Sequence, residues 1–200
     1  MALYFVRHGE TDWNREKRFQ SITDVPLNAR GLAQAQCCAA ELGRRGVEIA
    51  ELRCSPLQRA VATARIIGDA LGVQAVVDPR ITEMTFGEWE GQHESELAAR
   101  FGEEFRDWRE SHYTTAPPGG DCLKDVAGRV TSALADISEA AISGNAMIVA
   151  HQAIMMAMKA ALTGDYSVES AFSYKQNNDE VDVWDIAARK QVEFFRFDCH

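Results

Sequence analysis

The sequence lacks the features that mark membrane, secreted and fibrous proteins. It contains only five cysteines and five prolines in 200 residues, and it has no internal repeat, low-complexity tract or linker. No apolar run approaches the length that crosses a bilayer, and the first apolar run meets Arg7 too soon for a secretion signal. Two hundred residues suffice for a sizeable core, so we expect one domain over residues 1–200.

Positive charge is scarce. Lys and Arg number 21 against 30 Asp and Glu, which gives a formal net charge of −9 at pH 7. This balance argues against a general affinity for nucleic acids or acidic membranes. An anionic ligand would therefore have to be held by a local cluster of cations.

The cysteines indicate neither a disulfide framework nor a metal site. They are odd in number and show no spacing typical of metal ligands, which favours free thiols in a reducing compartment. We therefore predict a cytoplasmic protein. The cysteines are Cys37, Cys38, Cys54, Cys122 and Cys199.

The most informative stretch is the N-terminal one. Residues 3–6 form a short apolar run typical of a buried strand, and Arg7, His8 and Gly9 follow its carboxyl end. Ligands of open α/β sheets bind at that end of the strands. A guanidinium fits phosphate oxygens, an imidazole can be a nucleophile, and Gly9 would let the backbone turn sharply and approach a ligand. Taken alone, these three residues are better explained by a strand that ends in a surface Arg-His pair.

The next segments alternate between helix and strand. The pattern predicts a helix over 29–45 with Gly46 as its C-cap, a strand over 49–54, and a strand over 74–77. Between these strands we expect a helix that begins at Ser55 as N-cap, with Pro56 in its first position, and ends at Leu71. This alternation implies a parallel sheet with right-handed crossovers.

Residues 80–120 interrupt the alternation. We predict one or two short helices over 94–111 and interpret the segment 80–120 as a cap over the active site, with its aromatic residues as the core of that cap. A helix over 121–143, a strand over 147–150 and a helix over 153–162 should follow. We predict the final strands over 172–175, 181–186 and 192–197. Their alternation indicates that they join the sheet as antiparallel or edge strands.

Five blocks of sequence, spread over nearly the whole chain, carry its most distinctive motifs. They are Arg7-His8-Gly9-Glu10-Thr11 with Trp13-Asn14, Pro26-Leu27-Asn28 with Gly31 and Gln34-Ala35, Cys54-Ser55-Pro56-Leu57-Gln58-Arg59-Ala60 with Thr63-Ala64, Glu83 with Gly87 and Trp89-Glu90-Gly91, and Val149-Ala150-His151. In residue type and order these blocks resemble the histidine phosphatase superfamily, which includes cofactor-dependent phosphoglycerate mutases and related phosphatases. The resemblance implies a three-layer α/β/α sandwich with a mostly parallel central sheet and a small helical cap.

The resemblance also implies roles for particular residues. His8 would be the nucleophile that forms a phosphohistidine, and Glu83 would be the general acid. Arg7, Arg59 and His151 would bind the phosphoryl group and stabilise its charge, and no metal or cofactor is implied. From the residues alone, each has a plainer interpretation: an Arg paired with a carboxylate, a surface carboxylate, or a structural histidine at a strand end.

Two further residues complete the implied phosphate site. Asn14 stands at a family position where an amide would donate to phosphate, and Gln152 stands where the family often has glycine. Ser21-Ile22 likewise replaces a frequent family glycine after Arg-Phe-Gln. These departures leave the substrate open.

The expected charges follow from simple electrostatics. Arg7 and Arg59 should disfavour the protonated form of His8 and so keep it nucleophilic. The same cations should lower the pKa of Glu83, and a bound phosphate dianion should raise it into the range of a working acid. His151 is expected to stay protonated beside the phosphate.

The block around Glu83 favours a phosphatase over a mutase. Phosphoglycerate mutases of the family carry an Asn-Glu-Arg-His-Tyr-like sequence there, whereas this chain has Thr82-Glu83-Met84-Thr85-Phe86. We therefore predict a phosphoric monoester hydrolase that acts on a small phosphorylated metabolite, without nucleic acid or membrane partners. A phosphoglycerate mutase is the alternative, and a non-catalytic phosphate-binding module is a further one. The oligomeric state stays open, a homodimer being one option.

Overall fold

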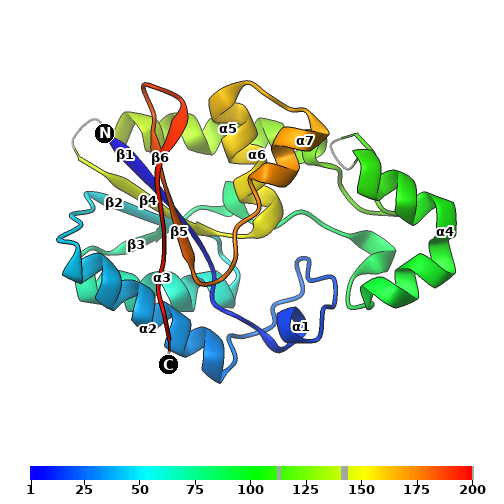
Figure 1. Cartoon of the computed structure of the whole chain (residues 1–200), viewed down its shortest axis with the longest axis horizontal. Coiled ribbons are helices and arrows are strands. Elements are labelled where there is room, and N and C mark those ends of the chain that lie inside the picture. Colours follow the sequence, from blue (N-terminus) through cyan, green and yellow to red (C-terminus); the bar gives the residue numbers. More distant parts are fainter. Residues whose placement is uncertain (112–113, 141–143, 200) are drawn as a thin grey trace.

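The computed structural model describes residues 1–111, 114–140 and 144–199. Within these residues a six-stranded sheet lies at the centre, with helices on both of its faces (Figure 1). The strand order is β3-β2-β4-β1-β5-β6. The predicted three-layer α/β/α arrangement is confirmed.

Four strands of the sheet are parallel and two are antiparallel. The parallel set is β1 (Ala2–Arg7), β2 (Glu51–Cys54), β3 (Ala75–Val77) and β4 (Ala146–Ala150). β5 (Glu180–Asp185) pairs antiparallel with β1, and β6 (Lys190–Arg196) pairs antiparallel with β5. The late strands are therefore the antiparallel edge that their alternating pattern predicted.

Alternate side chains of β1 reach opposite layers, because successive residues of a strand point to opposite faces. Leu3 and Phe5 belong to a core shared with α5 (Leu123–Ala140) and α6 (Gln152–Thr163). Tyr4 and Val6 belong to a second core shared with α2 (Ala29–Arg44) and α3 (Gln58–Leu71). Both faces of β1 are thus buried, which explains its unbroken apolar run.

Capping residues mark most of the ends of α2 and α3. Asn28 caps α2 by accepting from the backbone N–H of Gly31, and Gly46 follows the helix with a φ of 63°. Gly72 ends α3 in the left-handed conformation, as expected. The start of α3 was predicted wrongly: Leu57 is its N-cap, and Ser55 lies in the connection before it.

One predicted strand is a helix instead. Residues 172–175 were expected to be extended, but α7 (Val168–Ser173) covers the start of that range. Ser167 Oγ accepts a hydrogen bond from the backbone N–H of Ser170, which satisfies a donor in the first turn of this helix. A run of four residues is too short for its periodicity to distinguish the two structures. The predicted helix over 121–143 is α5, and residues 141–143 lie outside the described part of the chain.

A long helix stands apart from the sheet. α4 (Glu94–Ser111) projects to one side of the molecule and bends at Gly102, which has a φ of 49° and a ψ of −108° (Figure 1). Trp89, Leu97 and Phe105 form its small buried core, and Trp89 is wholly buried. Trp89 and Phe105 are therefore packing residues of this core, as predicted, whereas Trp108 also lines the pocket described below. Among the described residues, no helix is both long and apolar enough to cross a bilayer.

Candidate active site

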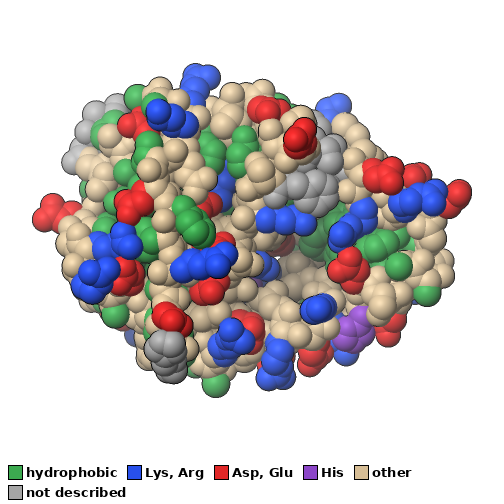
Figure 2. Space-filling model, viewed as in Figure 1, with side chains coloured by type: hydrophobic (Ala, Val, Ile, Leu, Met, Phe, Trp, Pro, Cys, Tyr) green, Lys and Arg blue, Asp and Glu red, His purple; other side chains and the backbone are tan. Residues whose placement is uncertain are grey.

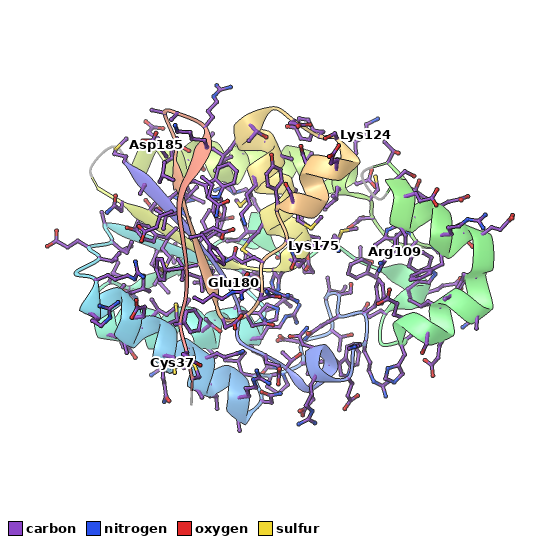
Figure 3. All side chains as sticks on the ribbon, in the orientation of Figure 1. Cys37, Arg109, Lys124, Lys175, Glu180 and Asp185 are labelled. Atoms are coloured by element: carbon purple, nitrogen blue, oxygen red, sulfur yellow. The ribbon has the colours of Figure 1, made fainter. Side chains whose placement is uncertain are left out.

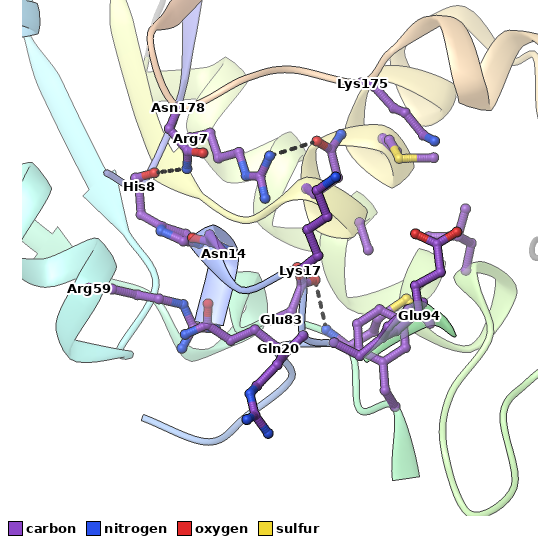
Figure 4. Close-up of a pocket in the computed structure, with 18 of the residues that line it drawn as sticks. Arg7, His8, Asn14, Lys17, Gln20, Arg59, Glu83, Glu94, Lys175 and Asn178 are labelled. Atoms are coloured by element: carbon purple, nitrogen blue, oxygen red, sulfur yellow. Dashed lines mark hydrogen bonds between the residues drawn. The ribbon is translucent and has the colours of Figure 1, made fainter. Parts of the chain in front are cut away.

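A pocket of about 420 Å³ lies between the carboxyl end of the sheet and α4. Figure 2 shows the hollow in the surface, with basic side chains beside it. The residues that line its inner end come from β1, α3, α6 and the loops between them (Figure 4). Of the predicted site residues, those that line the pocket are Arg7, His8, Asn14, Arg59, Glu83 and Gln152.

The sheet register brings the two histidines together. β1 and β4 are parallel neighbours, with Arg7 opposite Ala150, so His8 and His151 both follow the last paired residue of their strands. The backbone N–H of His8 donates to the carbonyl of Ala150 at 3.1 Å. The two imidazole centroids lie 5.1 Å apart. Residues separated by more than half of the chain thus share one site.

His8 is buried and held in a defined orientation. Its Nδ1 lies 2.8 Å from the carbonyl oxygen of Gly9, so a neutral ring donates from Nδ1 and keeps a lone pair on Nε2. Burial, and then the charges of Arg59 and Arg7, hold the pKa of His8 well below its usual value. The expected direction is confirmed, with burial as the larger cause. A neutral imidazole with a free Nε2 is the form that can attack an electrophile.

The structure gives Gly9 a packing role, and its predicted approach to a ligand stays a prediction. Its φ is not in the left-handed region, and a Cβ at this position would lie 2.3 Å from the carbonyl oxygen of Gly31. A Cβ on Gly31 would in turn lie 2.1 Å from the carbonyl oxygen of Glu10. The two glycines therefore allow the loop after β1 to pack directly on the first turn of α2.

The two arginines are held by neutral oxygens. Arg7 Nη1 donates to the carbonyl of Gln176 at 3.1 Å, and Arg59 donates to the carbonyls of Thr23 and Ser21 at 2.9 and 2.7 Å. Neither forms a salt bridge within the described chain. The plainer interpretation of a structural Arg-carboxylate pair is therefore wrong for Arg59. Two guanidinium charges thus face the pocket without a carboxylate bonded to either.

Glu83 is a buried carboxyl group. Its Oε1 accepts from the backbone N–H of Met84 at 3.0 Å, and the side chain is 7% exposed. Burial raises the pKa of Glu83, while Arg59 and Arg7 oppose this shift. The two cations act in the expected direction, but the net shift is upward because desolvation outweighs them. Arg129 fixes this segment by donating to the carbonyl of Thr82 at 2.5 Å.

His151 is fully buried and held by Ser55. Its Nε2 lies 2.7 Å from Ser55 Oγ, whereas Nδ1 has no partner within the described chain. Burial, followed by the charges of His8, Arg59 and Arg7, lowers the pKa of His151 well below its usual value. The protein by itself therefore disfavours the protonated form that we expected.

Gln152 is tied to Arg7. Its Oε1 accepts from Arg7 Nη1 and from the backbone N–H of Gln176, each at 3.3 Å. Its Nε2 is buried and has no partner among the described residues. Asn14 accepts on Oδ1 from the backbone N–H of Thr11, which leaves Nδ2 for a ligand. Both amides can therefore donate into the pocket.

Sequence reasoning missed four residues that position the site. Ser55 had been expected only to cap a helix. Ser21 joins Arg59 of α3 to the segment of Glu83, since its carbonyl accepts from Arg59 and its Oγ donates to the carbonyl of Met84. Gln176 and Asn178 lie between the predicted strands 172–175 and 181–186. Asn178 Nδ2 donates to the carbonyl of His8 at 2.5 Å (Figure 4). No local sequence signal pointed to these tertiary contacts.

Comparison with known proteins identifies the family. The sequence profile of the histidine phosphatase superfamily (branch 1) matches residues 3–194. The chain belongs to the histidine phosphatase superfamily. This confirms the resemblance, and it confirms the prediction of an enzyme of the phosphoric monoester hydrolase class.

The individual relatives carry different names. Phosphoserine phosphatase 1 of Hydrogenobacter thermophilus is 31% identical over all of this chain and 94% of its own length. The 2,3-bisphosphoglycerate-dependent phosphoglycerate mutase of Mesorhizobium japonicum is 33% identical over 82% of each chain. The structure of mycobacterial glucosyl-3-phosphoglycerate phosphatase in complex with VO3 superimposes with a TM-score of 0.83, at 30% identity and with 91% of each chain covered. The fold prediction is thus confirmed, whereas these names leave the substrate of this chain open.

Proposed function

We propose that this protein is a metal-independent phosphatase that hydrolyses a small phosphomonoester through a phosphohistidine on His8. One observation carries the proposal: a neutral His8, oriented by Gly9 O at 2.8 Å, shares a pocket with two guanidiniums that form no salt bridge within the described chain. A phosphoryl group between Arg7 and Arg59 has its charge offset before reaction, and phosphoryl transfer depends mainly on such positioning and electrostatic stabilisation.

In the first step His8 Nε2 attacks phosphorus, the P–N bond forms and the ester P–O bond breaks. The leaving alkoxide takes a proton from Glu83. Since burial already raises the pKa of Glu83, a phosphate dianion nearby adds to an existing shift toward the protonated acid. Glu83 ends this step as a carboxylate.

In the second step water attacks the phosphohistidine. Glu83 takes a proton from the water, the new P–O bond forms, and the P–N bond breaks to release inorganic phosphate. His8 and Glu83 return to their starting forms. Asn14, Gln152 and His151 hold the phosphoryl oxygens during both steps. His151 becomes protonated only with the dianion present, because the protein alone lowers its pKa.

We propose that segment 80–120 is a cap over the pocket. Glu94, Trp108 and Arg109 of α4 line the pocket opposite the sheet, which supports this assignment. The cap would restrict water and shape the space beyond the phosphoryl group.

A phosphoglycerate mutase remains the second candidate, because a named mutase is 33% identical over 82% of this chain. The same phosphohistidine would then be transferred to a second hydroxyl instead of water. A module that only binds phosphate is disfavoured by the presence of both histidines, both arginines and the buried acid in one site.

One experiment separates the three candidates. The purified protein is incubated, with chelator present, with an aryl phosphate and with 3-phosphoglycerate, the latter with and without 2,3-bisphosphoglycerate. We expect release of phosphate that is lost in His8→Ala, and a phosphorylated His8 in rapidly quenched samples analysed by mass spectrometry. His93→Ala is the matched control, since His93 lies outside this pocket and bonds the carbonyl of Glu16.

Each alternative has its own outcome. Isomerisation of 3-phosphoglycerate without net release of phosphate would make the protein a mutase. Phosphate binding without turnover of any ester would make it a binding module. Loss of activity with chelator would contradict the metal-independent mechanism.

A further inference from the structure

The loop between α7 and β5 passes beside the two residues that would bind and attack a phosphoryl group. Within this loop, residues 174–179, the carbonyl of Gln176 accepts from Arg7, and Asn178 donates to the carbonyl of His8 (Figure 4). The five sequence blocks that resemble the histidine phosphatase superfamily do not include this loop. Whatever fixes the loop therefore also fixes part of the site.

Arg7 lies just beyond the strand pairing on its β5 side. The antiparallel ladder between β1 and β5 ends at the pair Val6–Val181, one residue before Arg7. From there the loop takes over. Arg7 Nη1 donates to the carbonyl of Gln176 at 3.1 Å and to Oε1 of Gln152 at 3.3 Å. The backbone N–H of Gln176 donates to the same Oε1, so Gln176 holds Arg7 both directly and through Gln152.

The side chain of Gln176 is buried, and both ends of its amide are engaged. Its Nε2 donates to the carbonyls of Phe5 at 2.7 Å and Glu180 at 2.8 Å, which ties the loop to β1 and to the start of β5. Figure 3 shows Glu180 at this start of β5. Its Oε1 accepts from Lys159 Nζ at 3.2 Å. Because an ammonium group can only donate, Lys159 decides which end of the amide faces it.

Lys159 is the charged residue of α6, whose other buried residues are all apolar. Its side chain is wholly buried. Its three N–H groups have three acceptors, which are the carbonyl of Tyr174 at 3.3 Å, Oε1 of Gln176 and Oδ2 of Asp182. Two of these acceptors belong to the loop, and the third neutralises the charge.

This buried ion pair has no evident value for stability alone. Withdrawing two charges from water costs about as much free energy as their attraction recovers, and apolar residues of similar volume often stabilise a core as well or better. An apolar side chain at position 159 would pack in α6, but it could not donate a directed hydrogen bond to Gln176. The lysine therefore contributes geometry that a purely apolar helix face would lack.

We propose that Lys159 is a positioning residue of the active site: its ammonium group, neutralised by Asp182, fixes Gln176 and thereby holds Arg7 in the orientation that meets the phosphoryl group. This inference rests on the proposed function, because it assumes that Arg7 binds the phosphoryl group. Lys159 itself does not line the pocket. Without it the guanidinium of Arg7 is less well oriented, and it stabilises the transition state less.

The test removes both charges at once. The double variant Lys159→Met with Asp182→Leu leaves no unpaired charge in the core, so its urea midpoint should stay close to that of the wild type. Orthovanadate is the probe, because its five-coordinate adduct resembles the transition state of phosphoryl transfer. Its inhibition constant against aryl phosphate hydrolysis should rise about tenfold, as for one lost orienting hydrogen bond, and kcat/KM should fall by a similar factor.

NMR of the arginine side chains shows which guanidinium has moved. The Nε atoms of Arg7 and Arg59 are both buried, and their N–H signals can be assigned with Arg7→Lys and Arg59→Lys. In the double variant the Arg7 signal should shift and broaden. The Arg59 signal should not change, because Arg59 is held by the carbonyls of Ser21 and Thr23 instead.

Two further variants separate positioning from folding. Ile137→Ala is the stability control, since Ile137 is wholly buried in the core that α5 shares with α6. It should lower the urea midpoint without changing inhibition by vanadate. Gln176→Met keeps the ion pair of Lys159 and Asp182 but removes the amide between Lys159 and the site. It should weaken inhibition by vanadate as the double variant does, and it carries the test if the double variant does not fold.

The outcomes keep the two proposals distinct. Unchanged vanadate inhibition together with an unchanged Arg7 signal would overturn the role of Lys159 and leave the phosphatase intact. Equal changes in the Arg7 and Arg59 signals would also overturn it, because they would reflect a general loosening. Failure of the wild type to hydrolyse the aryl phosphate would instead count against the proposed function, and calorimetric titration with inorganic phosphate would then compare the wild type with the double variant.

Discussion

His151 Nε2 lies 2.7 Å from Ser55 Oγ, inside the sheet edge where β2 and β4 end side by side. Ser55 Oγ also accepts from the backbone N–H of Leu57 at 3.3 Å, so its own proton is free to donate to the imidazole. This leaves Nδ1 of a neutral His151 as the N–H, and that atom has no partner in the described chain. Ser55 therefore selects which nitrogen of His151 can donate to a phosphoryl oxygen.

Ser55→Ala should lower kcat for a small phosphomonoester by about tenfold, the value expected for one lost orienting hydrogen bond. KM should change less, because both arginines still bind the ground-state phosphate. Steady-state kinetics over a pH range test this role, and the tautomer of His151 can be followed by 15N NMR. An unchanged imidazole spectrum together with unchanged kcat would show that Ser55 is only a structural residue.

Glu83→Gln should slow hydrolysis of an alkyl phosphate by about 10²- to 10³-fold, because the alkoxide then leaves without a proton. An aryl phosphate should be affected much less, since its leaving group needs no acid. In the wild type the rate on the alkyl ester should fall as pH rises through the raised pKa of Glu83. Comparison of both substrates across pH checks the assignment, and equal losses on the two esters would rule out the acid.

Stability should decrease as pH falls below about 6.5, the ordinary pKa of histidine. His8 and His151 have folded pKa values well below this, so the unfolded chain binds protons first and acid favours unfolding. Each histidine can contribute a slope of up to about 1.4 kcal/mol per pH unit. The pKa of Asp78 is lowered to about 2, so this carboxylate affects the stability only in more acidic solution.

Urea unfolding at pH 7.0 and pH 5.5 measures this slope. His151→Asn should reduce it, and His93→Asn is the control, because His93 lies outside the pocket and bonds the carbonyl of Glu16. A wild-type urea midpoint that stays constant between these pH values would contradict the buried neutral histidines.

Gly31→Ala should destabilise the protein by about 2–3 kcal/mol, since the new methyl group would lie 2.1 Å from the backbone oxygen of Glu10. Backbone cannot move aside as a flexible side chain can. Gly43→Ala, in the same helix with nothing within 4 Å of the added Cβ, should be neutral or stabilising. Chemical denaturation of both variants tests the contact, and equal stabilities would mean that the first turn of α2 adjusts freely.

The sequence by itself determined the sheet and most of its helices. The apolar run 3–6 required burial on both faces, and alternation of helix and strand then dictated parallel strands. Because parallel strands end at one edge, Arg7, His8 and His151 could meet there, and the pairing of β1 with β4 brings them together. Glycine at positions 46 and 72 marked helix ends for a purely local reason, the cost of a left-handed conformation for other residues.

The tertiary structure alone decided the chemistry of those residues. Burial raises the pKa of Glu83 against two nearby cations, and it is the largest cause that lowers the pKa of His151. Ser55 and Asn178 act through contacts across 96 and 170 positions of the chain. Desolvation and long-range hydrogen bonds depend on what surrounds a group in space, and local sequence patterns do not contain that information.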